Sequence, residues 1–315
     1  MPRHTRPRSG CMACNASSTL HRPLAVTIMN MAVNEAVELI ERQEWLQPLE
    51  DGLQQAVHAS YEAMCEAGPP VRDFLHGKWL GHPLHAAVTD VPVGAWSAAA
   101  VLDVAGNPAA DSAIKIGLGG AALAALAGLT DWHVTDGKAR RIGFVHGMLN
   151  VTAVGLYLAS LAKRSSGDRG SGRALGYAGF MVALASSFLG GKLVYSQRIG
   201  VTHTPPPEQT EDFVPVLAES DLPENELRRV EVKSTRVLLV RRSGQVHAIA
   251  EVCAHLGGPL AEGKLDGDIV ECPWHGSRYS IVDGSVVAGP SVHPQPCYET
   301  RLRDGQIEVR PAARC

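Results

Sequence analysis

Two short motifs indicate a metal centre: Cys253-Ala-His255-Leu-Gly-Gly and Cys272-Pro-Trp-His275-Gly-Ser, with 16 residues between His255 and Cys272. Each motif offers one thiolate and one imidazole on a short loop that contains glycine. The two soft thiolates can hold one iron of a binuclear cluster and the two imidazoles the other, with sulfides bridging the irons. The same four side chains can instead hold one structural zinc ion. The residue types alone leave both metal centres open.

The two motifs resemble the signature of the Rieske family, C-x-H-(x15–17)-C-x-x-H, which they match in full. The resemblance extends from about Asp212 to Val309 and includes Gly289-Pro290, a dipeptide that covers the cluster in that family. It implies a [2Fe-2S] cluster, with Gly289 and Pro290 beside it. The metal ligands that it implies are Cys253, His255, Cys272 and His275.

Departures from the family pattern indicate the branch. Respiratory members carry two further cysteines that form a disulfide between the loops, and here those positions are Gly258 and Trp274. This implies the ferredoxin or oxygenase-type branch, which generally has a lower potential. Ser277 and Tyr279 stand where high-potential members place hydroxyl donors to cluster sulfur, which stabilise the reduced state. We therefore expect a potential between the two branches, unless both are ordinary loop and strand residues.

The region around the motifs is predicted to be an all-β domain over residues 212–311. Short runs that alternate or are β-branched, separated by turns with glycine, predict strands at Arg229–Lys233, Arg236–Arg241 and Val246–Ala250. Without the disulfide and without an export signal, the domain is expected in the cytoplasm. Because the chain ends at Cys315, we expect an oxidoreductase component for electron transfer rather than a complete oxygenase.

Upstream of this domain, four segments are rich in glycine and alanine and poor in charge. They are Leu84–Ala105, Ala113–Asp131, Ile142–Ala162 and Ala174–Leu193. A membrane-spanning helix needs ~20 mostly apolar residues, so the segments predict four transmembrane helices, with a buried soluble bundle as the alternative. The expected fold class is therefore multidomain: an all-α four-helix transmembrane bundle followed by an all-β Rieske iron–sulfur domain.

The remaining boundaries follow from composition. Residues 1–31 are expected to be disordered, and Cys11-x-x-Cys14 lacks the second pair that a metal site needs. Residues 32–79 are predicted to be a cytoplasmic helical segment, with one helix ending at Gly68-Pro69-Pro70. The bundle then covers residues 80–198 and a proline-rich linker residues 199–211. The net charge of −3 argues against a partner that is a nucleic acid.

Charge near the spans predicts the orientation. The flanks of the bundle and its middle loop carry seven basic residues: Arg72, Lys78, Lys138, Arg140, Arg141, Lys192 and Arg198. The opposite loops carry five: Lys115, Lys163, Arg164, Arg169 and Arg173. The positive-inside rule then places both ends of the bundle in the cytoplasm. We expect a multi-pass protein of the bacterial inner membrane, with its Rieske domain on the cytoplasmic side.

Histidines gather at one end of the predicted spans, and ionisable groups there usually have a function. His85 lies near the start of the first span and His146 near the start of the third, while Asp90 lies ~7 Å deeper than His85. Three interpretations stay open: structural histidines at the interface, axial ligands of a b-type haem, or a quinone or other metal site. Asp90 is expected to relay protons or to pair with a histidine. The segment resembles an uncharacterised family of bacterial four-helix membrane proteins over residues 80–195, which implies no function.

The sequence therefore predicts a membrane-bound protein that carries single electrons on a [2Fe-2S] cluster. Its expected partners are electron donor and acceptor proteins, a soluble reductase, a quinone, or haem b within the bundle. The alternative is a redox-sensing or docking subunit, in which the state of the cluster changes the contacts of the helical segment at residues 32–67.

Overall fold

The computed structural model describes residues 34–208 and 210–312. The chain divides into two compact units, Met1–Arg42 and Gln43–Cys315. In the first, residues 34–41 are helical, and Arg42 pairs with Glu38 one turn earlier at 3.1 Å. The predicted disorder of residues 1–31, with Cys11 and Cys14, lies outside the described residues.

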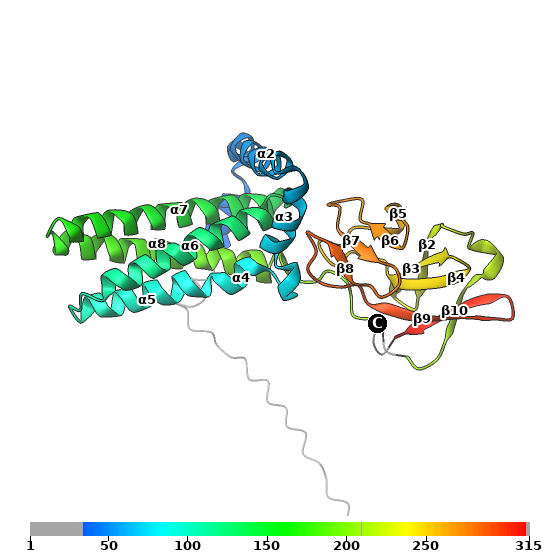
Figure 1. Ribbon diagram of the computed structural model, residues 1–315. Helices are drawn as coiled ribbons and strands as arrows, with labels where there is room; N and C mark the ends of the chain where they lie inside the picture. Colours follow the sequence, from blue (N-terminus) through cyan, green and yellow to red (C-terminus); the bar gives the residue numbers. More distant parts are fainter. Residues whose placement is uncertain (1–33, 209, 313–315) are drawn as a thin grey trace, which may run out of the picture. The chain divides into compact units, whose positions relative to one another are not determined.

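Four long helices form the bundle, as predicted, and lie side by side in Figure 1. They are α5 (Asp90–Val104), α6 (Ala110–Trp132), α7 (Gly137–Ser165) and α8 (Arg169–Tyr195). Their most apolar windows have a mean hydropathy between 1.2 and 1.6, so each is long and apolar enough to cross a membrane when the first is counted from Leu84. The packing is closest within the pairs α5–α6 and α7–α8.

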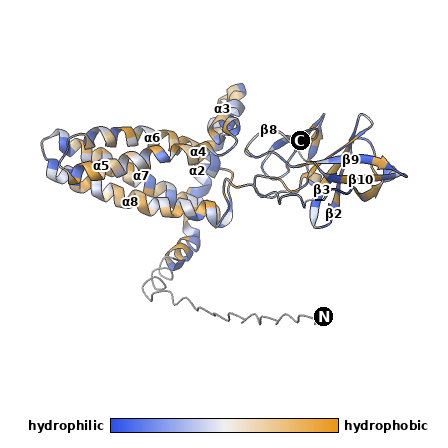
Figure 2. Cartoon of the chain, turned by 90° about the horizontal axis from the view of Figure 1, so that it is seen from below, coloured by the Kyte–Doolittle hydropathy of each residue, from blue (hydrophilic) through white to orange (hydrophobic). Residues whose placement is uncertain are grey.

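The outer surface of these helices is apolar, and Figure 2 shows hydrophobic residues over much of their length. Every one of the four helices exposes large hydrophobic side chains, among them Val101, Ile116, Leu126, Val151, Leu158, Met181 and Phe188. Water would solvate such a surface poorly, whereas lipid tails match it.

The first predicted span, Leu84–Ala105, is found at Leu84–Val104, with one break in the helix that the sequence did not predict. A short helix, α4 (Leu84–Val88), ends at Thr89, and α5 begins at Asp90. Proline at position 92 lacks the N–H that would bond to the carbonyl of Val88, so the helical ladder has a gap at this point.

The segment before the bundle contains two helices, α2 (Gln47–Ala63) and α3 (Gly68–His76), with 3-10 turns at Glu44–Leu46, Cys65–Ala67 and Lys78–Leu80. The prediction that Gly68-Pro69-Pro70 ends a helix is wrong, because these residues begin α3. Proline suits the first turn of a helix, where its missing N–H would have no partner in any case.

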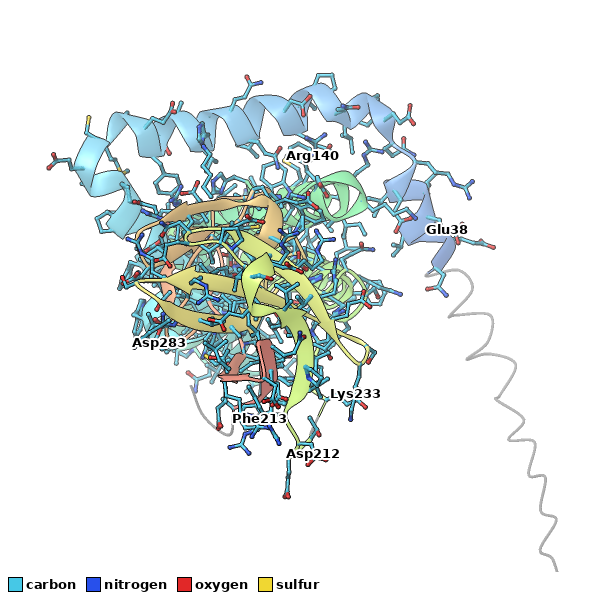
Figure 3. The ribbon with its side chains drawn as sticks, turned by 90° about the vertical axis from the view of Figure 1, so that its right-hand side faces the viewer. Glu38, Arg140, Asp212, Phe213, Lys233 and Asp283 are labelled. Atoms are coloured by element: carbon cyan, nitrogen blue, oxygen red, sulfur yellow. The ribbon has the colours of Figure 1, made fainter. Side chains whose placement is uncertain are left out.

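Helix α2 is fixed to the bundle by buried charge. Glu50 is fully buried and accepts from the side chains of Arg140, at 3.1 Å, and Arg141, at 3.4 Å. Arg140 also pairs with Asp51 at 2.8 Å, and Figure 3 shows Arg140 beneath α2. Ion pairs of this kind hold a surface helix in one position, because a lone buried carboxylate would be unfavourable.

At the other end of the bundle, a second group of charges is buried between α5 and α7. Arg164 is 4% exposed and donates to Asp103 at 2.7 Å and to Asp111 at 3.0 Å. Arg169 pairs with Asp111 at 3.1 Å from a more exposed position. These contacts join all four helices at this end.

The C-terminal domain is all-β, as predicted, and contains two antiparallel sheets (Figure 1). The larger has the strand order β1-β10-β9-β4-β3-β2, and the smaller has the order β5-β6-β7-β8. The strands are β1 (Val214–Ala218), β2 (Leu227–Val232), β3 (Thr235–Arg242), β4 (Gln245–Ala250), β5 (Lys264–Asp266), β6 (Ile269–Glu271), β7 (Arg278–Ser280), β8 (Val286–Ala288), β9 (Cys297–Arg303) and β10 (Gln306–Pro311); short 3-10 turns lie at Glu219–Asp221 and Leu260–Glu262.

Apolar side chains fill two cores, one on each face of β3. Val237 and Leu239 belong to the core beneath the larger sheet, and Leu238 and Val240 to the core shared with the smaller sheet. The start of the domain is held by Phe213, whose ring lies between Arg301, at 4.1 Å, and Arg310, at 4.5 Å. Figure 3 shows Phe213 beside β9 and β10.

Candidate metal centre

The first motif forms a tight loop directly after β4. The N–H of Cys253 donates to the carbonyl of Gly258 at 2.9 Å, and the N–H of Gly257 donates back to the carbonyl of Cys253 at 2.9 Å. Gly257 has φ +82°, in the left-handed region that side chains other than glycine rarely adopt. Glycine is therefore required for this turn.

The second motif repeats this construction after β6, in the other sheet. The N–H of Cys272 donates to the carbonyl of Ser277 at 2.8 Å, and the N–H of Gly276 donates to the carbonyl of Cys272 at 3.1 Å. Gly276 has φ +73°. Each sheet thus contributes one Cys–His loop, and the candidate centre lies where the sheets meet.

The four predicted ligands lie at this junction as two pairs, one of thiols and one of imidazoles. Both thiols are buried, and the two imidazole rings, of His255 and His275, have their centroids 5.0 Å apart. Nδ1 of His255 is buried without a hydrogen-bond partner among the described residues. A buried ring nitrogen with a free lone pair is unfavourable unless it binds a metal.

Three of the four side chains have pKa values shifted toward the form that binds metal, whereas the hydrogen bond with Cys272, together with burial, raises the pKa of Cys253 and keeps the proton of the pair on that thiol. A hydrogen bond with Cys253 lowers the pKa of Cys272 to about 7, helped by the N–H groups of Trp274 and His275 and opposed by burial. Burial, followed by the charge of His275, lowers the pKa of His255 well below its usual value. Thiolate and neutral imidazole are the forms that bind metal.

Two hydroxyl groups lie in the shell around the thiols. The hydroxyl of Tyr279 lies 3.2 Å from Sγ of Cys253, and burial raises its pKa, so it stays protonated and able to donate. Ser277 is fully buried, and its Oγ accepts from the N–H of Ser291 at 3.1 Å, which leaves its own proton free for another acceptor. Ser291 follows Gly289-Pro290, so this bond ties that dipeptide to the second motif.

Comparison with known proteins agrees with this geometry. A family model described as "Rieske [2Fe-2S] domain" matches residues 212–299. Ferredoxin CarAc of Metapseudomonas resinovorans is 34% identical over 98 residues, which are 31% of this chain and 92% of that ferredoxin. The chain belongs to the Rieske family. The ferredoxin component of the p-cumate 2,3-dioxygenase system of Pseudomonas putida is 36% identical over 100 residues, 31% of this chain and 85% of that protein.

These relatives confirm the ferredoxin or oxygenase-type branch and make the chain an electron-carrying Rieske protein with a domain that supports a [2Fe-2S] cluster. Human apoptosis-inducing factor 3 is 31% identical over 114 residues, but this chain spans only 19% of its length. Among solved structures, the ferredoxin of carbazole 1,9a-dioxygenase from Nocardioides aromaticivorans IC177 matches with 27% identity and a TM-score of 0.31, covering 32% of this chain and all of that one.

A second family model, described as "Predicted membrane protein (DUF2231)", matches residues 81–203. Within this part, Nδ1 of His85 lies 2.8 Å from the carbonyl of Ala124, and Nδ1 of His146 lies 2.8 Å from the carbonyl of Ser186. Their rings are 6.2 Å apart. The structure thus brings together the two histidines predicted to share a site.

Asp90 lies apart from these histidines. It is exposed in the first turn of α5, where a carboxylate suits the positive end of the helix dipole. The predicted pairing of Asp90 with a histidine is absent from the described residues.

Sequence reasoning did not identify His76, which is 1% exposed at the end of α3. Its Nδ1 lies 2.8 Å from Asp131, and its Nε2 has no hydrogen-bond partner among the described residues. His76 and Asp131 line a small cavity together with His255 and Pro290 of the Rieske domain. Nothing in the spacing of these residues could have indicated this contact, because it depends on how the chain folds back.

Two further contacts join the helical part of the chain to the loops of the Rieske domain. The N–H of Gly289 donates to the carboxylate of Asp73 at 3.0 Å, and Lys78 donates to the carbonyl of Val287 at 2.8 Å. In the linker, the N–H of His203 donates to the carbonyl of Ala254 in the first motif at 2.9 Å.

Proposed function

We propose that the protein is a membrane-bound carrier of single electrons, with Cys253 and Cys272 as ligands of one iron and His255 and His275 as ligands of the other. The observation that supports this most directly is the pairing of two buried thiols with two imidazoles, one of which has an orphaned Nδ1. A [2Fe-2S] cluster bound there supplies reversible one-electron chemistry. The residues fit that group.

The arrangement favours a cluster over the zinc alternative. One zinc ion needs four ligands that converge on a single point. Over residues 34–208 and 210–312, no three histidine, cysteine or acidic side chains form such a group. A binuclear cluster instead separates the thiolate pair from the imidazole pair by the two irons, which suits four ligands that do not share one centre.

The bundle supports a role in a membrane. Four helices of spanning length with apolar exposed faces, and the match to a predicted membrane protein family, favour insertion in the bacterial inner membrane. The contacts of Asp73 and Lys78 with the loops at Val287 and Gly289 would hold the cluster close to the membrane part. A quinone or haem b at His85 and His146 would then be the nearer partner, and a soluble reductase or oxygenase the other.

Turnover tests this function. Full-length protein in bacterial membrane vesicles would be mixed with a water-soluble quinol, or with NADH and a ferredoxin reductase, while the electron paramagnetic resonance (EPR) signal of the reduced cluster is followed. An electron carrier is expected to be reduced and reoxidised many times per chain, and the Cys272→Ser variant not at all. If dithionite reduces the cluster but neither the quinol nor the reductase system supports turnover, the redox-sensing alternative is favoured.

Replacing Tyr279 with phenylalanine is expected to lower the midpoint potential of the cluster by roughly 40 mV. The hydroxyl beside Sγ of Cys253 would stabilise the more negative reduced state, and ~1 kcal/mol of such stabilisation corresponds to about that shift for one electron. Redox titration monitored by EPR measures it. Tyr298→Phe is the control, since its buried hydroxyl has no partner among the described residues. Equal potentials in Tyr279→Phe and wild type would contradict this role for Tyr279.

A further inference from the structure

The bundle is built from two equivalent helical hairpins. Asp103 and Arg164, which form the buried ion pair, are 61 residues apart. The same separation relates His85 to His146 and Trp96 to Tyr157, and both of these pairs also touch: the rings of Trp96 and Tyr157 stack with centroids 4.4 Å apart. Three pairs of equivalent residues in mutual contact define a pseudo-two-fold axis between the hairpins, because only residues near such an axis meet their own equivalents.

The second helices of the two hairpins, α6 and α8, are equivalent as well. Their equivalent residues are one residue further apart in the sequence than the 61 that separate those of α5 and α7. Glycines at equivalent positions pack against the axial residues: Gly117 against Trp96 and Gly179 against Tyr157. The two halves therefore share a backbone arrangement although few residues are identical. Among those few are the axial histidines and the pairs Val93-Gly94 and Val154-Gly155.

His85 and His146 also make equivalent hydrogen bonds to the second helix of their own hairpins. Each Nδ1 faces a carbonyl at an equivalent place on the next helix, Ala124 for His85 and Ser186 for His146, both at 2.8 Å. Nδ1 of His146 also lies 2.9 Å from Oγ of Ser186. A carbonyl accepts only from N–H, so Nδ1 carries the proton in each ring and Nε2 keeps its lone pair.

Glycines also leave room for the two rings. A Cβ at Gly128 would lie 2.8 Å from Nδ1 of His85, and one at Gly190 would lie 3.2 Å from Cε1 of His146. These glycines occupy equivalent positions in the two hairpins. A residue larger than glycine at either position would push the imidazole ring away. Both hairpins therefore keep space for a ring at the same place.

The distance between the rings fits one metal ion between them. With metal–nitrogen bonds of about 2.0–2.1 Å and each ring centre roughly 1.1 Å behind its nitrogen, two imidazoles on opposite sides of an ion have centres about 6.3 Å apart. The centroids of His85 and His146 are 6.2 Å apart, and the ring planes are at 88°. Nε2 of His146 now accepts from the amide of Asn150 at 3.1 Å, a bond that a metal would replace.

Two imidazoles alone are a poor site for a bare ion. In the described part of the chain, no third histidine, cysteine or acidic side chain joins them to form a group that could hold one. A metalloporphyrin brings four equatorial nitrogens of its own and needs only two axial ligands.

We propose that His85 and His146 are the axial ligands of a b-type haem on the pseudo-two-fold axis of the bundle. This deepens the proposed function, because it names the redox partner within the bundle. One electron from the reduced cluster would convert the ferric haem iron to ferrous iron, and no atom is transferred. Each Nδ1–H bond to a backbone carbonyl fixes the orientation of an axial ring.

The test uses full-length protein in detergent, titrated with hemin and examined by optical and EPR spectroscopy. Wild type is expected to bind about one haem per chain, with a low-spin ferric spectrum and a sharp α band on reduction. Perpendicular ring planes predict a strongly anisotropic low-spin EPR signal. His85→Gly and His146→Gly are each expected to give high-spin haem, and added imidazole is expected to restore the low-spin form. His82→Ala is the matched control, since His82 is exposed three positions before His85.

A wild-type protein that binds no more haem than the His85→Gly/His146→Gly double variant would overturn the site. High-spin haem in the wild type, or quinone co-purifying in place of haem, would also overturn it. The EPR signal of the reduced cluster in the same samples reports on the Rieske domain separately. A wild-type protein that binds no haem but has an intact cluster signal would therefore refute this inference and leave the electron-carrying function standing.

Discussion

Replacing Cys272 with serine is expected to abolish the cluster. The thiol is buried at the junction of the two sheets and already has a lowered pKa, about 7, which favours the thiolate. Serine is a poor ligand for iron, and three remaining side chains cannot close both coordination spheres. Non-haem iron and acid-labile sulfide should fall from about two of each per chain to near zero, with loss of the visible absorption and the reduced EPR signal of the cluster.

The matched control is Cys65→Ser, which removes an exposed free thiol between α2 and α3. It is expected to keep full iron and sulfide content. A Cys272→Ser protein that retains iron and sulfide at the wild-type level would show that the ligand assignment is wrong. A wild-type protein that carries about one zinc per chain and no iron or sulfide, and that loses the zinc in Cys272→Ser, would favour the zinc alternative.

Replacing Arg164 with leucine is expected to destabilise the bundle by about 3–5 kcal/mol, because buried Asp103 would keep only its longer contact with Arg173, at 3.8 Å. The effect is measurable as a fall in the midpoint of thermal unfolding in detergent. The double variant Asp103→Leu/Arg164→Leu should recover most of the loss, since two apolar side chains can replace a buried pair with little change in stability.

Arg169→Leu serves as the control for Arg164. Its side chain is 39% exposed, and it pairs with Asp111 rather than with Asp103. Exposed ion pairs contribute about 0–1 kcal/mol, so this variant should unfold close to the wild type. If Arg164→Leu and Arg169→Leu lowered the unfolding midpoint equally, the buried pair of Arg164 with Asp103 would stabilise the bundle no more than an exposed ion pair does.

The sequence was sufficient to predict features that depend on residues close together in the chain. The two Cys–His motifs each lie within one loop, so residue order alone brings their ligands together. The spans were predictable because lipid demands long apolar helices, whatever their order in the bundle. The break between α4 and α5 within the first span was not predicted, although Pro92 removes one of its backbone hydrogen bonds.

Features that depend on long-range packing escaped prediction. From its position, Arg164 counts as a cation of a loop, yet the fold buries it against Asp103. The repeat was hidden because only a few residues match between the hairpins, and contact between equivalent residues reveals it more clearly than identity does. His76 and Asp131 are separated by 55 positions without any pattern that links them.

The ion pair on the pseudo-two-fold axis has a consequence for assembly. Two identical hairpins would place two aspartates or two arginines face to face at this level, and like charges buried together repel strongly. The opposite charges of Asp103 and Arg164 make the two hairpins of this chain complementary to each other. A homodimer of either hairpin would be disfavoured, so each hairpin is suited to pair with the other one of the same chain.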